Sequence, residues 1–187
     1  DFLKGIKKIL RSDGTVIIQF SAYLSKLISQ REFDTIYHEH YSYFSFYTLN
    51  KIFETHGFKI FDVDELKIHG GSLRIYATNK KHKVNVSKKI QRLIVKERKL
   101  GLRNLKTYTE FNNKVIELKF ELWKFFINAN RQGKKVACYG APAKGNTLLN
   151  YCGIKNDLID YTVDISPHKQ GFYLPGTHIP IMNPNHI

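Results

Sequence analysis

The four residues Tyr37-His38-Glu39-His40 are the part of this chain whose side chains are best suited to chemistry. They place a phenol, two imidazoles and a carboxylate side by side, and further hydroxyl side chains follow over residues 41–45. An imidazole can act as a base near neutral pH, and a phenol can hydrogen-bond an oxyanion as it forms. Burying such a cluster costs free energy unless its groups are used. We therefore predict a proton-transfer site here, with a structural histidine as the equally weighted alternative for His38.

The same cluster does not predict a metal centre. His38 and His40 stand two residues apart without a clear third ligand, whereas zinc sites use three or four protein ligands. Cys138 and Cys152 lie in unrelated contexts, so they predict no zinc site and favour a reducing, cytoplasmic setting.

The elements around the cluster must position it. Apolar residues at helical spacing over 3–10 predict a helix, Asp13-Gly14 predicts a turn, and the β-branched run Thr15–Phe20 is typical of a buried parallel strand. Ligands of open α/β sheets bind beyond the carboxyl ends of the strands. The cluster follows that end, so we expect it at the edge of a site.

Downstream of the cluster, residues 48–57 read as a helix with Thr48 as its N-cap and Gly57 at its C-terminal end. Period-two alternation predicts strands over 58–64 and 72–78. The Gly70-Gly71 turn between these strands predicts an antiparallel pair.

This order of elements resembles the second half of a class I S-adenosylmethionine-dependent methyltransferase sheet. More narrowly, Tyr37-His38-Glu39-His40, with Ser42-Tyr43-Phe44-Ser45 and then His69-Gly70-Gly71-Ser72-Leu73-Arg74, is similar to the nucleotide-sugar C-methyltransferases. Those enzymes methylate a ring carbon next to a ketone in a dTDP-linked keto-sugar. The resemblance implies that S-adenosylmethionine is the cofactor and that a nucleotide-linked sugar is the substrate.

The resemblance also implies roles for individual residues. His40 is the candidate general base, Tyr37 a contact to the enolate or substrate, and Glu39 an orienting carboxylate. Ser72, in the glycine turn, and Arg74 are candidate substrate-binding residues, because glycines let a backbone approach a ligand closely and an arginine can reach a phosphate. A plain hairpin turn and an ordinary exposed strand arginine are the alternatives.

Residues 80–133 read as a helical connector. The stretch 86–100 is amphipathic, Gly101 interrupts it, and apolar residues at helical spacing then recur over 111–125 until Gln132-Gly133. We interpret this segment as packing helices with a solvated charged face.

Residues 134–187 contain a predicted βαβ unit, with strands over 135–139 and 158–164 and a helix opening at Leu148-Leu149. The loop 140–147 fails as a strict dinucleotide fingerprint because Pro142 replaces its middle glycine, and it fails as a P-loop because Asn146 replaces the lysine. A helix N-terminus still attracts phosphate, Lys144 adds a charge, and Asp164 has nearly the spacing of a ribose-binding acid. The alternative is a structural α/β lobe with a tight turn.

The family resemblance continues through 139–147 and 164–171. It implies a Rossmann-like C-terminal domain that helps to hold the nucleotide-sugar, with Gly140, Lys144, Asn146 and Asp164 as candidate substrate-binding residues. The expected fold class is thus α/β: the C-terminal half of a class I methyltransferase sheet over 1–79, the helical connector over 80–133, and a truncated Rossmann-like domain over 134–187.

Composition limits the partners. The chain has 30 Lys and Arg against 16 Asp and Glu, but the lysines are scattered and no nucleic-acid motif appears. We therefore expect no nucleic-acid partner, and we expect no membrane association because no apolar run reaches about 18 residues. A diphosphate-bearing small molecule would also explain a local basic pocket.

The family's donor-binding half, with its glycine-rich loop and its acid for the donor ribose, has no counterpart in these residues. We therefore expect weak S-adenosylmethionine binding by this chain alone. Three hypotheses follow: a C-methyltransferase fragment that is inactive alone, a subunit whose donor-binding half comes from a separate chain, or a non-catalytic nucleotide-sugar-binding module.

Overall fold

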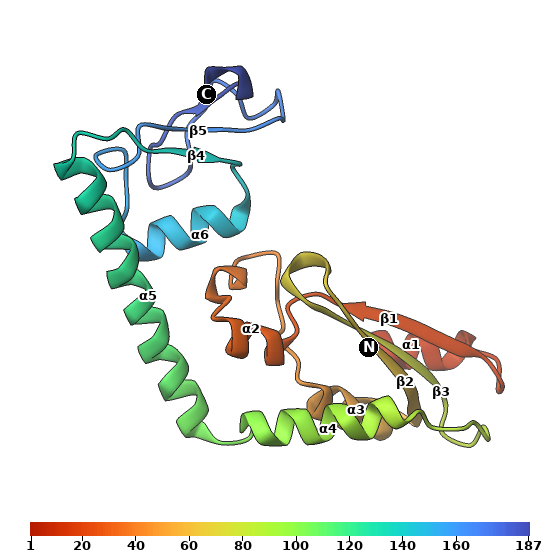
Figure 1. Cartoon of the computed structure of the whole chain (residues 1–187). Coiled ribbons are helices and arrows are strands. Elements are labelled where there is room, and N and C mark those ends of the chain that lie inside the picture. Colours follow the sequence, from red (N-terminus) through yellow and green to blue (C-terminus); the bar gives the residue numbers. More distant parts are fainter. The chain divides into compact units, whose positions relative to one another are not determined.

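A computed structural model describes the backbone of residues 1–187 and every side chain except that of His69 (Figure 1). The chain divides into two units, the first comprising 1–32 and 40–111 and the second 33–39 and 112–187. This division differs from the three predicted segments in two respects. The boundary falls inside the long helix α5 (Leu105–Arg131), and residues 33–39 leave the first segment to join the second unit.

The first unit is built on a three-stranded sheet of β1 (Thr15–Phe20), β2 (Phe58–Leu66) and β3 (Ser72–Asn79). The spatial order is β1-β3-β2, with β3 antiparallel to both neighbours, which confirms the predicted antiparallel pair. The reading of Thr15–Phe20 as a buried parallel strand is wrong. Alternate residues of β1 pack against the core, but Ile17 on the opposite face is 58% exposed.

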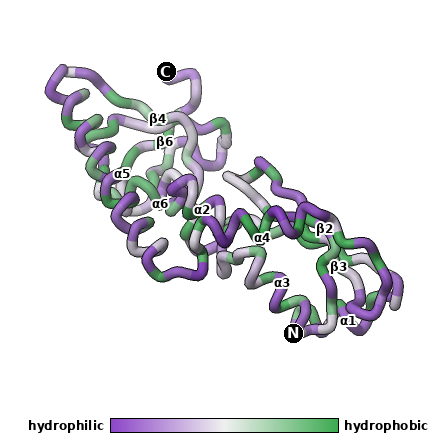
Figure 2. Tube along the Cα trace, turned by 60° about the horizontal axis from the view of Figure 1, so that its bottom comes forward, coloured by the Kyte–Doolittle hydropathy of each residue, from purple (hydrophilic) through white to green (hydrophobic). Residues whose placement is uncertain are grey.

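Helices cover the apolar face of this sheet. They are α1 (Phe2–Ile9), α3 (Phe46–Thr55) and α4 (Lys88–Leu100), and the shorter α2 (Leu24–Gln30) follows β1. The buried core of the unit includes Phe46, Phe53, Phe58, Leu73 and Ile75. In Figure 2, α4 shows both hydrophilic and hydrophobic stretches, as expected for an amphipathic helix that buries only Ile90, Leu93 and Glu97.

The N-terminus of α3 lies one turn earlier than predicted. Thr48 is inside the helix, and Ser45 is the N-cap, because its hydroxyl accepts a hydrogen bond from the Thr48 backbone N–H at 3.1 Å. Capping hydroxyls stabilise helices by pairing backbone N–H groups that have no partner in the first turn. Ser45 is an N-cap residue by type, but the sequence does not reveal the tertiary contacts made at the start of this helix.

A buried carboxylate completes this cap from another helix. Glu97 of α4 is 4% exposed and accepts hydrogen bonds from the backbone N–H groups of Phe46 (2.6 Å) and Tyr47 (3.0 Å). It also accepts from the Tyr23 hydroxyl at 2.8 Å. Burial, together with the Glu97 charge, raises the pKa of Tyr23, so the phenol stays protonated and donates to the carboxylate.

The second unit contains a three-stranded parallel sheet of β4 (Ala137–Tyr139), β5 (Tyr161–Val163) and β6 (Ile181–Met182), in that spatial order. The helix α6 (Ala143–Cys152) connects β4 to β5, which confirms the predicted strand, helix and parallel strand. The helix begins at Ala143, five residues before the predicted start. The core contains Phe126 of α5, Leu149 and Cys152 of α6, and several buried isoleucines.

Short 3-10 helices complete the fold at Phe33–Thr35, Ile68–Gly70 and Pro184–His186. Within the described residues, none of the helices combines the length and the apolar character that crossing a bilayer requires.

We predict that Glu97→Ala lowers the free energy of unfolding of the first unit by about 2 to 4 kcal/mol, since two backbone donors and one phenol lose a charged acceptor in a buried site. Amide hydrogen exchange at Phe46 and Tyr47 measures the local loss, and chemical denaturation followed by circular dichroism measures the global one. Glu110→Ala is the matched control: this exposed glutamate should change stability by less than about 0.5 kcal/mol. Equal effects of the two substitutions would contradict the role of Glu97.

Candidate functional site

The Tyr37–His40 cluster lies in a segment without helix or strand, between the 3-10 turn Phe33–Thr35 and α3. Tyr37 and His40 are half-buried, while His38 and Glu39 are exposed. None of the four side chains is fully buried. The division between the two units falls between Glu39 and His40, so Tyr37 and Glu39 belong to the second unit and His40 to the first.

The part of this segment in the second unit is anchored on α6. Phe33 is buried, and its ring lies 4.8 Å from the ring of Tyr151 on α6. The Tyr37 ring meets the His38 ring edge-on at 5.9 Å. The fold therefore places Tyr37 and Glu39 in the same unit as the glycine loop 140–147, which is about a hundred residues away in the sequence.

The part in the first unit is fixed beside the carboxyl end of β1. The rings of His40 and Tyr43 lie 6.4 Å apart in an edge-to-face arrangement. Phe44 packs edge-to-face on Phe20, the last residue of β1, at 5.7 Å, and its carbonyl oxygen accepts a hydrogen bond from the Leu24 N–H at 3.1 Å. The residues that follow His40 are therefore held at the carboxyl end of β1. The order of elements in the sequence predicts the edge of a site at this strand end.

The glycine turn before β3 reaches the same strand end. The Gly71 carbonyl oxygen accepts a hydrogen bond from the Tyr23 N–H at 3.5 Å. Gly71 has φ +126°, and a Cβ there would lie 2.6 Å from Cγ of Lys26. Gly71 is therefore required by its close contact with Lys26 of α2, and not by contact with a ligand.

Ser72 and Arg74 both have structural partners. The buried Ser72 hydroxyl donates to the Ile68 carbonyl oxygen at 3.2 Å, and Arg74 donates to the Gln19 side chain on β1 at 3.0 Å. These contacts favour the structural reading of the turn and an ordinary strand arginine.

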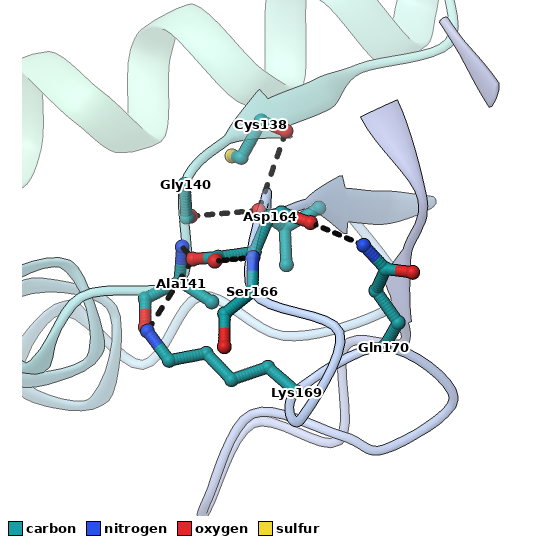
Figure 3. A network of polar contacts seen from close by, with 8 residues as sticks. Cys138, Gly140, Ala141, Asp164, Ser166, Lys169 and Gln170 are labelled. Atoms are coloured by element: carbon teal, nitrogen blue, oxygen red, sulfur yellow. Dashed lines mark hydrogen bonds and ion pairs between the residues drawn. The ribbon is translucent and has the colours of Figure 1, made fainter. Parts of the chain in front are cut away.

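The glycine loop of the second unit is held by Asp164, at the end of β5 (Figure 3). Its Oδ2 accepts a hydrogen bond from the Ala141 N–H at 2.7 Å, and its Oδ1 accepts one from the Ser166 N–H at 2.9 Å. Lys169 donates to the Ala141 carbonyl oxygen at 3.0 Å and lies 3.4 Å from Asp164 Oδ2. The carboxylate therefore joins the loops that follow β4 and β5.

This arrangement changes the interpretation of Asp164. The backbone N–H groups of Ser166 and Ala141 hold the pKa of its carboxyl group below the ordinary value, so the group is ionised at neutral pH. Both oxygens already accept hydrogen bonds within the protein, which favours a loop-positioning role over direct ribose binding.

The N-terminus of α6 is the part of the loop best suited to an anion. Pro142 is its N-cap and provides no side-chain hydrogen bond, so the first-turn amides are not capped by that residue. Lys144 lies half-buried in this first turn. The Asn146 side chain accepts a hydrogen bond from Asn150 at 3.3 Å.

A cavity of about 210 Å³ adjoins the loop. Its lining is largely apolar and comprises Cys138, Tyr139, Gly140, Ala141, Pro142, Gly145, Asn146, Leu148, Leu149 and Leu174. The loop thus combines uncapped amides with a small apolar hollow, which suits a ligand that has both an anionic and a ring part.

Sequence reasoning missed two contributors to this site. Lys169 lies in the stretch 164–171 that resembles the family, but its hydrogen bond to Ala141 depends on how the loops after β4 and β5 meet. Phe33 preceded the cluster, and only the fold reveals that it packs on Tyr151. An isolated apolar residue before a polar cluster was the available signal for Phe33.

Comparison with known proteins gives a consistent result. The family described as C-methyltransferase C-terminal domain matches residues 67–187. The C-methyltransferase NovU of Streptomyces niveus is 35% identical over 184 residues, which cover 98% of this chain and 44% of NovU. The chain therefore spans less than half the length of this relative.

We predict that Asp164→Asn destabilises the second unit by about 1 to 2 kcal/mol at pH 7, since charge-assisted hydrogen bonds to two backbone amides and Lys169 are lost. The folded pKa is lowered, so the stabilisation is fully present above the ordinary carboxyl pKa of 3.8 and disappears as the pH falls through the folded value. The difference between variant and wild type should therefore shrink in acid.

Trp123, the single tryptophan, reports on this unit, because its indole N–H donates to the Cys152 carbonyl oxygen at 2.7 Å. Urea titrations followed by its fluorescence at several pH values make the measurement. Asp157→Asn, at an exposed position of the same unit, is the control. A destabilisation that persists unchanged in strong acid would rule out the charge of Asp164 as its cause.

Proposed function

This chain belongs to the C-methyltransferase family, and from that premise we propose that it is the acceptor-binding part of an enzyme that methylates a sugar carbon. The substrate is a dTDP-linked keto-sugar, and the methylated carbon lies next to its ketone. The main support is that the Tyr37–Glu39 segment and the glycine loop share one unit, with His40 as the next residue. A sugar attached to a nucleotide needs such a combination of a proton-transfer group and a phosphate site.

In the proposed reaction His40 acts as the general base. Its neutral imidazole removes a proton from the carbon next to the ketone, and the electron pair of the broken C–H bond forms the enolate. The Tyr37 hydroxyl donates a hydrogen bond to the enolate oxygen, where negative charge develops. Glu39 orients the protonated base. The enolate carbon is then the nucleophile that forms the new carbon–carbon bond.

The residues of this chain do not fit a site for S-adenosylmethionine. A donor nucleoside needs an acid at a strand end for its ribose hydroxyls. Asp164, the candidate acid at such an end, has both oxygens engaged by loop donors. Held by a donor-binding part, S-adenosylmethionine would supply the electrophilic methyl group, and its methyl–sulfur bond would break as the carbon–carbon bond forms, leaving the electron pair on sulfur.

The edge of β1 is the proposed contact for that donor-binding part. Within the described residues β1 pairs with β3 alone, which leaves one strand edge available for further pairing. We propose that the sheet is the C-terminal half of a class I methyltransferase sheet and that the donor-binding half extends it at β1. That half belongs either to the same polypeptide or to a separate chain.

The nucleotide diphosphate is proposed to bind at the Rossmann-like βαβ unit of β4, α6 and β5. Lys144 and the first amides of α6 contact the phosphates, Gly140 allows close backbone approach, and Asn146 contributes a polar side chain. Asp164 shapes this loop. In the first unit, Ser72 and Arg74 are proposed not to contact the substrate. They affect it indirectly, by holding the turn and the strand beside the end of β1.

A non-catalytic nucleotide-sugar-binding module is the second candidate. It is favoured by the hydrogen bonds that Asp164 and Lys169 form with Ala141 and Ser166, which all lie inside the second unit. This candidate binds the same ligand but moves no proton, which separates it from the enzyme.

We predict that His40→Asn abolishes exchange of the sugar's α-proton with solvent deuterium in the enzyme assembled with its donor-binding half. Proton NMR of a dTDP-keto-sugar in D₂O follows this enolisation without methyl transfer, and a turnover assay follows the complete reaction. His38→Asn, which removes the neighbouring exposed imidazole, is expected to retain exchange. Exchange at the wild-type rate in the His40 variant would exclude His40 as the base, and no exchange by wild type would favour the binding module.

We predict that Lys144→Ala weakens dTDP binding about tenfold, the effect of losing about 1.4 kcal/mol of a charged phosphate contact. Isothermal titration calorimetry with the wild-type chain and the variant makes the comparison. Lys155→Ala removes the same charge from an exposed position after α6 and should bind dTDP like the wild type. Unchanged affinity in the Lys144 variant would remove its phosphate role.

A further inference from the structure

The first unit contains a second cavity, which the proposed methyl transfer does not use. It has a volume of about 660 Å³ and lies between α3, α4 and the turn that leads into α5. Its lining comprises Ser45, Tyr47, Asn50, Ile94, Glu97, Arg98, Gly101, Leu102, Arg103 and Asn104. All of these residues belong to the first unit, and the volume is within the range of small-molecule sites, about 300 to 1,000 Å³.

The charge of this cavity is positive. Glu97 is its one acidic lining residue, and its carboxylate already accepts hydrogen bonds from Phe46, Tyr47 and Tyr23. Arg98 and Arg103 line the cavity as well, and both are exposed at its mouth. Among the side chains that the structure describes, neither arginine forms an ion pair. The cavity therefore presents two guanidinium groups without a protein counter-ion.

The wall around these guanidinium groups is aromatic and apolar. The Arg103 guanidinium carbon lies 4.5 Å from the centre of the Tyr47 ring, and Lys51 Nζ lies 4.9 Å from it. Ile94 and Leu102 supply aliphatic surface. A hydrogen bond from Lys51 and the nearby charge of Arg103 lower the pKa of Tyr47, as the closeness of these two cations to the ring requires.

We propose that this cavity binds an aromatic anion about the size of a mononucleotide, a planar ring carrying a phosphate or carboxylate. The anionic group pairs with Arg98 and Arg103, which present the planar donor array that such groups accept. The ring packs on Ile94, Leu102 and the stacked Arg103–Tyr47 pair. The N-terminus of α3 is not a second anion site in this cavity, because its first amides already donate to the Glu97 carboxylate.

Such a ligand would also be coupled to the fold. It would contact α3 and α4, the two helices that the hydrogen bonds of the Glu97 carboxylate join. Binding to the folded unit alone stabilises it in proportion to ligand concentration. The ligand should therefore raise the melting temperature of the first unit and slow exchange of the Phe46 and Tyr47 amides.

The test uses adenosine monophosphate as the probe, with adenosine and inorganic phosphate as its two halves. Titration of the ¹⁵N-labelled chain separates the two units, since this cavity reports through amides of residues 45–51 and 94–104 and the glycine loop through 139–147. We expect adenosine monophosphate to shift the first set. Arg98→Gln and Arg103→Gln should each weaken that binding about tenfold, while Arg92→Gln, an equal charge change at an exposed position of α4 outside this cavity, should leave it unchanged.

Each other outcome overturns a defined part of the proposal. Shifts confined to the glycine loop, or no shifts, would exclude this cavity as the site. Phosphate binding as tightly as the nucleotide would remove the role of the ring, and adenosine binding as tightly would remove the role of the anion. Equal weakening of binding by Arg92→Gln would show that the arginine substitutions act through the net charge of the chain and not through contacts in the cavity. None of these results bears on the keto-sugar reaction, which the exchange assay with His40→Asn tests separately.

Discussion

Carboxylates that accept hydrogen bonds from otherwise unpaired backbone N–H groups hold both units of this protein in shape. In the second unit, Asp164 joins the ends of two parallel strands by accepting from Ala141 and Ser166. A parallel sheet places the loops after its strands at one edge, and here the Gly140 N–H also donates to the Val163 carbonyl oxygen of β5 at 2.6 Å. Without the carboxylate, the Ala141 N–H would lose its charged acceptor, and the loop would keep the contact from Lys169 to the Ala141 carbonyl oxygen. The candidate phosphate site therefore depends on a residue that need not touch the phosphate.

In the first unit, the carboxylate that accepts from backbone N–H groups is the buried Glu97. An ionised carboxylate in an apolar core costs several kcal/mol unless donors surround it. The α3 amides and the protonated Tyr23 phenol supply these donors, and the raised pKa of Tyr23 keeps its proton in place. Since Glu97 of α4 accepts hydrogen bonds from Tyr23, which follows β1, and from the first amides of α3, substitutions at Glu97 act on three segments at once. Among the described side chains, neither Arg98 nor Arg103 forms an ion pair, so two guanidinium groups face one carboxylate in the cavity beside Glu97.

The sequence predicted local elements better than their long-range partners. The antiparallel pair β2 and β3 and the βαβ unit followed from alternation and turn residues, which are local signals. The β-branched run Thr15–Phe20 was assigned to a buried strand because apolar composition does not reveal how many faces are covered. Ser45 and Thr48 are both N-cap residues by type, and the contact of Glu97 with the Phe46 and Tyr47 amides, which marks the true helix start, comes from about fifty residues later. Asp164 had the right spacing for a ribose contact, but its two loop donors appear only when the loops after β4 and β5 meet.

The division between the two units falls inside the candidate proton-transfer segment, between Glu39 and His40. Phe33 fixes the start of this segment on α6, the helix that begins at the candidate phosphate site. Consecutive Cα atoms are about 3.8 Å apart, so His40 stays one residue from the second unit in any arrangement of the two units. The proposed base is thereby tethered to the unit that is proposed to bind the nucleotide. In the proposed reaction, enolisation then depends on contacts within one unit and its next residue, and the donor-binding part need only bring the methyl group to a carbon that is already activated.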